Sequence, residues 1–322
     1  MPTNDASRWS LLAIGKFPDE VKSDFRAAFD SIFLDTTPSA GVNASLGARE
    51  ILITSFGNPL RRDAIAALPP SVKAIATYSV GYEHIDVEAA RERDLPVFNT
   101  PDVLTDAVAE VGLLLMLGAA RRVTESIGLI RGRHWTGWSP SQLIGVELLG
   151  KTLGILGMGR IGRGIAHRAR ACGMAIHYFN RRRLAPELEE GAAYHAGFDD
   201  MAGASDVLMI AAQSSPETRH FLNAERIAKL QHGAIVCNVA RGDLIDDDAL
   251  IAALGDGRVR AAGLDVFENE PKIDPRYYDL GNVFMLPHIG SSTIETRRRM
   301  ARALIAGLQI WKAGGKPANR VV

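Results

Sequence analysis

The sequence predicts an α/β protein with two domains, each built from βαβ units around a parallel sheet. Short apolar runs alternate with amphipathic stretches of helical spacing along most of the chain. The alternation forms two blocks, one before Asn99 and one after Lys151. A length of 322 residues is sufficient for two such domains, each with its own core.

The first block alternates strands with helices. Strands are predicted at Ser10–Ile14, Glu50–Thr54, Ala74–Thr77 and Pro96–Asn99, and helices at Asp19–Phe29, Arg61–Ala67 and Val87–Arg93. The segment Asn99-Thr100-Pro101 then interrupts the pattern. A long helix is predicted from about Leu104 to Arg131, capped near its start by Thr105 or Asp106 and apolar over much of its length.

The second block begins at Lys151. Strands are predicted at Thr152–Leu156, Met174–Phe179, Asp206–Ala211, Ala234–Asn238, Ala261–Leu264 and Val283–Leu286. The helix after the first of these strands, Arg160–Cys172, is expected to place Ile161, Ile165, Ala169 and Cys172 on one face. A final amphipathic helix, from about Thr293 to Lys312, is expected to return and pack on the first domain.

Composition and charge exclude several classes of function. Lys plus Arg and Asp plus Glu both number 37, so the net charge is zero and no large basic field for nucleic acid or an anionic membrane is expected. Only two cysteines occur, and the N-terminus lacks the pattern of a signal peptide. The longest apolar run, Val111–Ala120, is too short to span a bilayer. A cytoplasmic protein is expected, without a metal site, because no cluster of His, Cys, Asp or Glu has ligand spacing.

A glycine-rich loop, Gly157-Met158-Gly159-Arg160-Ile161-Gly162, predicts dinucleotide binding. The loop directly follows a predicted strand and opens a helix, which is the context that makes this motif specific. Gly157 permits a tight turn, Gly159 lets the backbone approach a pyrophosphate, and Gly162 lets helix and strand pack closely. The helix N-terminus offers N–H groups and partial positive charge to the phosphates.

The end of the second strand of this block favours NADP over NAD. NAD-binding proteins of this kind usually carry an acid about 20 residues after the loop, which binds the ribose 2′-hydroxyl. Here the strand is followed by Asn180-Arg181-Arg182-Arg183, and no acid occurs before Glu187. Arginine forms charge-assisted hydrogen bonds to a 2′-phosphate, each contributing roughly 1.5–3 kcal/mol. NADPH is therefore the predicted cofactor.

Three residues in loops after predicted strands form a candidate set for hydride-transfer chemistry: Arg241, Glu270 and His288. Because the carboxyl ends of parallel strands share one edge, these loops are expected to meet there. Arginine can bind the carboxylate and carbonyl of a keto acid, and histidine can protonate the oxygen as hydride arrives. A carboxylate on the other ring nitrogen would orient the histidine. The remaining histidines have ordinary explanations as packing, surface or solvated turn residues: His84, His134, His167, His177, His195, His220 and His232.

Several segments resemble the signatures of the D-isomer-specific 2-hydroxyacid dehydrogenases: Asn238–Gly242, Ala262–Val266, Pro287–Ser291 and the loop Tyr78–Asp86. The resemblance extends over nearly the whole chain, with the motifs in the same order. It implies two Rossmann-like domains, namely a discontinuous substrate domain of residues 1–100 plus 291–322 and a cofactor domain of residues 101–290. It also implies an active site in the cleft between them, and a homodimer formed largely by residues 101–150.

The resemblance also implies roles for individual residues. His288 would be the acid/base, paired with Glu270, and Arg241 would bind substrate. The further substrate-binding residues would be Val80 and Gly81, through their backbone N–H groups, with Ser55 and Trp138. The cofactor would be bound by Thr105, Gly157, Gly159, Arg160, Ile161, Gly162, Asn180, Arg181, Arg182, Ala212, Ala240, Asp265 and Gly290.

Within the family, the chain is most similar to NADPH-dependent glyoxylate/hydroxypyruvate reductases. Asn180-Arg181-Arg182 agrees with their cofactor, and Trp138 matches a tryptophan that in such reductases reaches into the partner subunit's active site. Reduction of glyoxylate or hydroxypyruvate is therefore expected. Two alternatives remain open: a reductase of a larger acid such as 2-ketogluconate or a phenylpyruvate-like compound, and a non-catalytic NADP-sensing or corepressor-like protein. Packing at a dimer interface alone remains open for Trp138.

Overall fold

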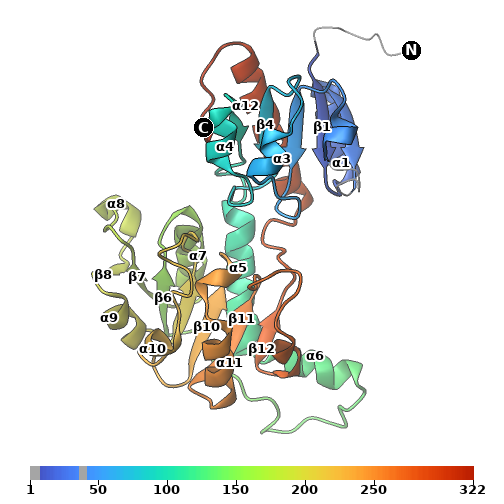
Figure 1. Cartoon of the computed structure of the whole chain (residues 1–322). Helices are drawn as coiled ribbons and strands as arrows, with labels where there is room; N and C mark the ends of the chain where they lie inside the picture. Colours follow the sequence, from blue (N-terminus) through green and yellow to red (C-terminus); the bar gives the residue numbers. More distant parts are fainter. Residues whose placement is uncertain (1–7, 36–41) are drawn as a thin grey trace. The chain divides into compact units, whose positions relative to one another are not determined.

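The computed structural model describes residues 8–35 and 42–322 of the chain (Figure 1). The chain divides into two compact units. The first unit comprises Met1–Leu104 together with Ser292–Val322, and the second comprises Thr105–Ser291. Each unit contains one parallel sheet, so the predicted α/β class with two Rossmann-like parallel sheets is confirmed.

The described residues of the first unit form a five-stranded parallel sheet in the order β2-β1-β3-β4-β5. Its strands are β1 (Ser10–Ile14), β2 (Asp30–Leu34), β3 (Ile51–Thr54), β4 (Ala74–Thr77) and β5 (Val97–Phe98). Its helices are α1 (Asp19–Ala28), α2 (Val42–Leu46), α3 (Arg62–Ala66), α4 (Val87–Glu92) and α12 (Ile294–Lys312). The sequence prediction placed β1 and β4 correctly but missed β2 and α2. In the edge strand β2, Asp30 and Ile32 are exposed and the other three residues are only partly buried, so its apolar signal is weak.

The C-terminal helix α12 packs on the first unit, which confirms its predicted return. Arg298 forms an ion pair with Asp24 of α1, with 2.9 Å between Nη2 and Oδ1. Trp9 and Trp311 meet edge to face, with ring centroids 5.2 Å apart. The apolar side of α12, including Met300 and Leu304, is buried in one of the two cores of the unit.

The second unit, all of which is described, has a seven-stranded parallel sheet in the order β12-β11-β10-β9-β6-β7-β8. Its strands are β6 (Thr152–Leu156), β7 (Ala175–Phe179), β8 (Ala193–His195), β9 (Val207–Ile210), β10 (Ala234–Asn238), β11 (Val259–Leu264) and β12 (Val283–Met285). Its helices are α5 (Thr105–Ala120), α6 (Val123–Arg131), α7 (Arg160–Ala171), α8 (Pro186–Glu189), α9 (Phe198–Gly203), α10 (Ala224–Ile227) and α11 (Asp247–Gly255), with 3-10 turns at Gly242–Leu244 and Pro275–Asp279.

The first strand of this sheet along the sequence, β6, lies in the interior of the sheet. The chain moves from β6 outward to β7 and β8, and then returns to β9 on the other side of β6. The carboxyl ends of β6 and β9 therefore flank a topological switch point, where ligands bind in open α/β sheets. β8 is a short edge strand that the sequence prediction missed.

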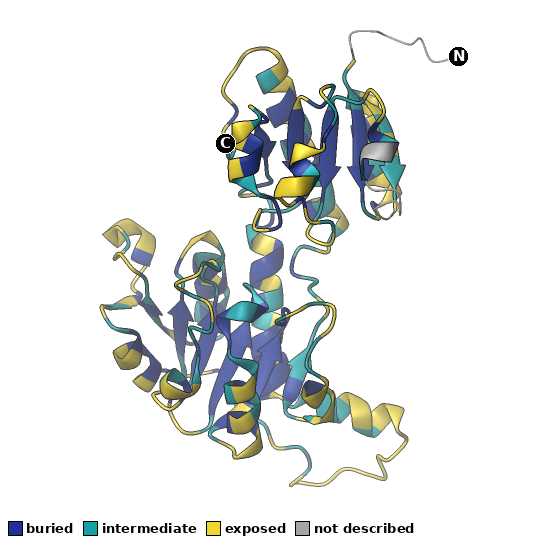
Figure 2. Cartoon of the chain, viewed as in Figure 1, coloured by how far each residue is buried: buried dark blue, intermediate teal, exposed yellow. Residues whose placement is uncertain are grey.

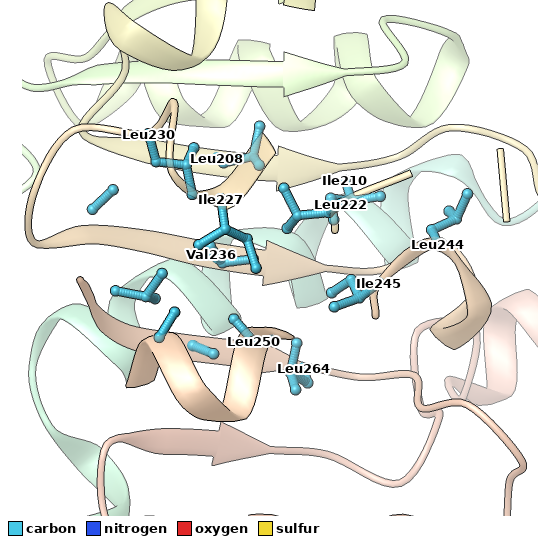
Figure 3. Packing of buried hydrophobic residues seen from close by; sticks show 14 of the residues in the cluster. Leu208, Ile210, Leu222, Ile227, Leu230, Val236, Leu244, Ile245, Leu250 and Leu264 are labelled. Carbon is cyan, nitrogen blue, oxygen red and sulfur yellow. The ribbon is translucent and has the colours of Figure 1, made fainter. Parts of the chain in front are cut away.

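Apolar side chains from the central strands and from the helices beside them form the main core of the second unit (Figure 3). Leu208, Val236 and Leu264 lie on β9, β10 and β11, and they share a cluster with Ile227 of α10 and Leu250 of α11 (Figure 3). The central strands β9 and β10 are dark blue in Figure 2 because all of their residues are buried. Continuous apolar runs are typical of parallel strands covered on both faces.

The predicted long helix Leu104–Arg131 is wrong as a single element. Helix α5 ends at Ala120, and α6 starts at Val123 after Arg122, whose φ of 55° lies in the left-handed region. Such a residue cannot continue a right-handed helix. Helix α5 is apolar around much of its surface because it packs against α7 and against β10 and β11.

The face of α7 differs slightly from the predicted one. Its buried residues are Gly162, Ile165, Ala166 and Ala169, whereas Ile161 is half-buried. Gly162, the last glycine of the loop motif, therefore belongs to the packed face of the helix. Within the described residues, none of the helices combines the length and apolar character required of a membrane span.

Candidate active site

The glycine loop connects β6 to α7 as the motif predicts. Gly157 has φ of +96°, and a Cβ atom there would lie 2.5 Å from the Ala212 backbone nitrogen. A Cβ atom on Gly162 would lie 2.5 Å from the Gly157 carbonyl oxygen. Both glycines are therefore required by the packing of the loop itself. Gly159, the N-cap of α7, has open space where its Cβ atom would point, so a ligand can approach the backbone there.

Asn180 ties the end of β7 to this loop. Its Oδ1 atom accepts a hydrogen bond from the Met158 backbone N–H at 2.7 Å. Arg181 and Arg182, which follow, are exposed. The site residues of this region thus come from the adjacent ends of β6 and β7.

Arg183, the third arginine of the cluster, is also exposed, but it pairs with an acid of its own unit. Its Nε atom lies 2.8 Å from Oε1 of Glu189, and the Tyr178 hydroxyl donates to the same carboxylate at 2.6 Å. These hydrogen bonds lower the pKa of the buried Glu189 to about 2. All three arginines are exposed, but Arg183 is engaged by Glu189, so Arg181 and Arg182 are the candidates for contacts with a ligand.

The turn after β10 carries Ala240 and Arg241. Asn238 is fully buried and organises this turn, because its Oδ1 accepts from the Ala240 N–H at 2.9 Å and its Nδ2 donates to the Arg241 carbonyl at 2.8 Å. Gly242 follows, and a Cβ atom there would lie 1.8 Å from the backbone carbon of Phe267. The Arg241 turn therefore packs directly against the loop that follows β11.

Asp265, at the end of β11, holds the segment that contains His288. Its carboxylate accepts from the backbone N–H groups of Ile289 at 2.7 Å and Gly290 at 2.8 Å, and its carbonyl accepts from the His288 N–H at 2.8 Å. Burial raises the pKa of Asp265, which is 1% exposed, although the two backbone hydrogen bonds act in the opposite direction. His288 has φ of 53°, so its backbone conformation depends on these anchors.

His288 and Glu270 are in direct contact. The Nδ1 atom of His288 lies 2.7 Å from Oε2 of Glu270, and Oε1 of Glu270 accepts from the Phe267 N–H at 2.8 Å. Burial raises the pKa of Glu270, but the hydrogen bond and charge of His288, the Phe267 N–H and the charge of Arg241 outweigh it, and the net shift is downward. The structure thus brings together Arg241, Glu270 and His288 near the carboxyl ends of neighbouring strands.

The substrate residues expected in the first unit lie after β3 and β4. Ser55 follows β3 and accepts a hydrogen bond from Nδ2 of Asn58 at 3.2 Å. In the loop after β4, Asn99 Nδ2 donates to the Val80 carbonyl at 2.8 Å, and Ser79 Oγ donates to the Gly81 carbonyl at 2.6 Å. These hydrogen bonds fix the orientation of the loop peptides.

A segment of the second unit that leads from α6 to β6 presents several large apolar side chains to solvent. Trp138 is 80% exposed, and Trp135 and Leu149 are also exposed. On α6, Ile127 and Ile130 are exposed as well. We call α6 and residues 132–150 the arm. Such a concentration of exposed apolar side chains is typical of a surface covered by another molecule.

Sequence reasoning missed several residues that organise the site. Asn238 and Gly242 could have been suspected from their place in the motif, whereas Glu189 and Glu268 act through contacts with other segments. Within residues 8–35 and 42–322, no group of three or more His, Cys, Asp or Glu side chains is arranged to hold a metal ion.

Comparisons with known proteins identify the family of the chain. Residues 113–290 match the family model "D-isomer specific 2-hydroxyacid dehydrogenase, NAD binding domain". The chain is 39% identical over 300 residues to a glycerate dehydrogenase of Hyphomicrobium methylovorum, covering 92% of this chain and 93% of the relative. It is 38% identical over 308 residues to 4-methyl-2-oxopentanoate reductase A of Aspergillus oryzae. This match covers 95% of this chain and 90% of the relative.

Among solved structures, the chain is similar to an NADPH-dependent glyoxylate/hydroxypyruvate reductase of Sinorhizobium meliloti in complex with NADP and malonate. The TM-score is 0.87 at 32% identity, over 98% of this chain and 97% of the other. The matched family model includes the glycine loop, Arg241, Glu270 and His288. The chain belongs to the D-isomer-specific 2-hydroxyacid dehydrogenase family, and its second unit contains the NAD(P)-binding domain.

Proposed function

We propose that the protein reduces a small 2-keto acid, glyoxylate or hydroxypyruvate, to the D-2-hydroxy acid with NADPH. The observation that supports this most directly is the contact between His288 Nδ1 and Glu270 Oε2 at 2.7 Å, near the Arg241 turn. The names of the similar proteins support reduction of 2-keto acids, and the exposed arginines support the phosphorylated cofactor.

The residues of the second unit fit an NADP molecule. The open backbone at Gly159 and the N-terminus of α7 suit the pyrophosphate, while Arg181 and Arg182 suit the 2′-phosphate. When bound, the cofactor supplies the hydride. The further residues that we assign to cofactor binding are Thr105, Gly157, Arg160, Ile161, Gly162, Asn180, Ala212, Ala240, Asp265 and Gly290.

The three central residues have complementary tasks in this proposal. Arg241 binds the substrate carboxylate and carbonyl oxygen, which aligns the keto carbon and stabilises the negative charge that develops on oxygen. His288 donates a proton from Nε2 to that oxygen as the carbon accepts the hydride. Glu270 receives the hydrogen bond from Nδ1, fixes the ring orientation and stabilises the protonated imidazole. The lowered pKa of Glu270 keeps this carboxylate charged.

Residues of the first unit complete the proposed substrate contacts. Val80 and Gly81 offer backbone N–H groups to the substrate carboxylate, and Ser55 lies beside them in the same role. Arg241 and these backbone N–H groups would then bind the substrate carboxylate together, while Arg241 also contacts the reacting carbonyl oxygen.

A cytoplasmic homodimer is the proposed working form. The arm carries exposed Trp135, Trp138, Ile127, Ile130 and Leu149, and covering these side chains with a second copy would remove a large apolar surface from water. In the dimer, Trp138 would reach the partner's substrate pocket and limit the size of the acid.

The experiment that tests this function measures oxidation of NADPH and NADH against a panel of 2-keto acids. The panel includes glyoxylate, hydroxypyruvate, 2-ketogluconate, phenylpyruvate and 4-methyl-2-oxopentanoate. We expect the highest kcat/KM with NADPH and one of the two small acids. Faster turnover with NADH would refute the assignment of Arg181 and Arg182.

A reductase of a larger 2-keto acid is the second candidate, and the 38% identity to a 4-methyl-2-oxopentanoate reductase favours it. In that case 4-methyl-2-oxopentanoate or another large acid would give the highest kcat/KM. A non-catalytic NADP sensor would bind NADPH without consuming it over the whole panel. The contact between His288 and Glu270 argues for catalysis, because a sensor has no use for an oriented proton donor.

A further inference from the structure

The loop that carries Glu270 also contains Glu268, whose side chain contacts a neighbouring segment. This loop, Val266–Pro271, follows β11 and is closed internally by the hydrogen bond from the Phe267 N–H to Glu270. That bond shapes the loop but does not fix it to the rest of the sheet edge. A contact between this loop and a neighbouring segment would restrain Glu270 in its place beside His288.

Glu268 makes such a contact with two cationic or ionisable partners. Its Oε1 atom lies 2.6 Å from Nη2 of Arg219, and its Oε2 atom lies 3.0 Å from Nε2 of His220. The Glu268 side chain is 15% exposed, whereas its partners Arg219 and His220 are 58% and 37% exposed, so the carboxylate lies beneath two partly solvated groups. Arg219 and His220 belong to the segment between β9 and α10. His220 lies at a turn and is 37% exposed, as expected of a turn histidine, and in addition it contacts Glu268.

The turn after β10 lies within the same assembly. The His220 N–H donates to the Asp243 carbonyl at 2.7 Å, and Ser214 Oγ donates to Asp243 Oδ2 at 2.7 Å. Gly242 packs against Phe267, with space for no side chain. The loops after β9, β10 and β11 are thus joined to one another by hydrogen bonds, close packing and the carboxylate of Glu268.

Three residues from two neighbouring elements define the charge environment of Glu268. Arg219 and His220 contact it directly, and Asp247 of α11 is close enough for Glu268 to contribute to its raised pKa, after the larger effect of burial. The Tyr277 hydroxyl donates to Asp247 at 2.7 Å. Asp247 is a second acid near Glu268. Arg219 and His220 therefore offset the repulsion that the Glu268 carboxylate would otherwise experience from Asp247.

We propose that Glu268 is a positioning residue for the reductase reaction, which fixes the loop after β11 to the loop after β9 and so holds Glu270 against His288. Glu268 does not contact His288 or Arg241 in this role. Its effect on turnover rests on the function proposed above, whereas its effect on the loop does not.

The test uses Glu268→Ala in the full-length protein, with Glu268→Gln as the conservative variant. Glutamine keeps an acceptor for Arg219, and its amide N–H₂ can donate to Nε2 of His220 in the tautomer that accepts there. We expect Glu268→Ala to lower kcat about tenfold, because small misplacements of catalytic groups have effects of this size. The Kd of NADPH should stay within about twofold, and Glu268→Gln should recover most of kcat. Glu50→Ala is the control, since Glu50 is 21% exposed and pairs with Lys73 at 2.6 Å in the first unit.

Two further measurements separate positioning from a general loss of stability. In a Glu270→Gln background, Glu268→Ala should change kcat by less than about twofold, because its effect acts through Glu270. Hydrogen–deuterium exchange should become faster over Val266–Lys272 in Glu268→Ala and stay unchanged there in Glu50→Ala.

Each outcome decides the proposal. Multiplicative effects of Glu268→Ala and Glu270→Gln on kcat would overturn it, as would unchanged exchange over Val266–Lys272. If the wild type reduces none of the acids, the proposed function fails, and the exchange measurement still shows whether Glu268 anchors the loop.

Discussion

Glu270 contacts His288 through one carboxylate oxygen and closes its own loop through the other. Oε2 lies 2.7 Å from Nδ1 of His288, and Oε1 accepts from the Phe267 N–H at 2.8 Å. A carboxylate bound at both oxygens has little rotational freedom, so it fixes the plane of the imidazole ring as well as its position.

Replacement of His288 with alanine should nearly abolish reduction of 2-keto acids, by about a thousandfold or more in kcat, because general acid catalysis contributes of that order. NADPH binding should remain within about twofold of wild type, since His288 is not assigned to the cofactor. Steady-state kinetics and the fluorescence of bound NADPH measure the two quantities. Normal turnover of His288→Ala would contradict the catalytic assignment.

Replacement of Arg181 and Arg182 together with alanine should raise the KM for NADPH about a hundredfold and leave the KM for NADH nearly unchanged. Each charge-assisted bond to the 2′-phosphate contributes roughly 1.5–3 kcal/mol, and NADH lacks that phosphate. Arg183→Ala is the matched control, because Arg183 pairs with Glu189. It should alter stability but not the ratio of the two KM values. A similar loss for NADPH and NADH in the double variant would show that these arginines do not distinguish the cofactors.

Gly159→Ala and Gly162→Ala should affect different properties: the first should weaken NADPH binding, and the second should lower stability. Gly159 has open space at its Cβ position, so Gly159→Ala should keep the wild-type melting temperature while weakening NADPH binding. Gly162→Ala places a Cβ atom 2.5 Å from the Gly157 carbonyl oxygen, which should cost about 1–3 kcal/mol of stability. Thermal unfolding and titration with NADPH give both values. Equal stability of the two variants would contradict the packing described for Gly162.

The pairing of Glu189 predicts a pH dependence of stability. The pKa of Glu189 is about 2 in the folded protein, against an ordinary value of 4.5. A lowered folded-state pKa stabilises the protein fully above the unfolded value, and this contribution is lost as the pH falls from 4.5 towards 2. The difference in unfolding free energy between wild type and Glu189→Gln should therefore be constant above pH 4.5 and shrink below it.

Urea unfolding at a series of pH values measures this difference. Glu190→Gln is the control, because Glu190 is exposed and pairs with Arg170 at 3.2 Å outside the Tyr178 contact. A difference between wild type and Glu189→Gln that grows as the pH falls below 4.5 would contradict the assignment.

The sequence predicted the regular elements best where the apolar pattern was strong. Strands β1, β4, β6 and β10 have the predicted bounds because they are buried, continuous apolar runs. The edge strands β2 and β8 were missed because their side chains are partly exposed. The helix break at Arg122 was missed because composition alone does not reveal a left-handed residue between two helical segments.

The site was predictable to the extent that it follows chain topology. Arg241 and Glu270 follow strands β10 and β11 and His288 follows β12, so strand order brings them close. The contacts of Glu189 with Arg183 and of Glu268 with His220 could not be predicted, because they depend on how individual loops fold back. The contacts of Asp265 could not be predicted either, because its carboxylate accepts hydrogen bonds from the backbone N–H groups of Ile289 and Gly290 in a different loop.

The return of α12 to the first unit has a consequence for biosynthesis. The side chains of α1 and the strands beside it, such as Phe25 and Leu11, share a core with Met300 and Leu304 of α12. The ribosome makes α12 only after all of Thr105–Ser291, so the second unit can complete its core first. The unit translated earliest is therefore finished last, and a chain interrupted before α12 exposes an apolar surface that chaperones and proteases recognise.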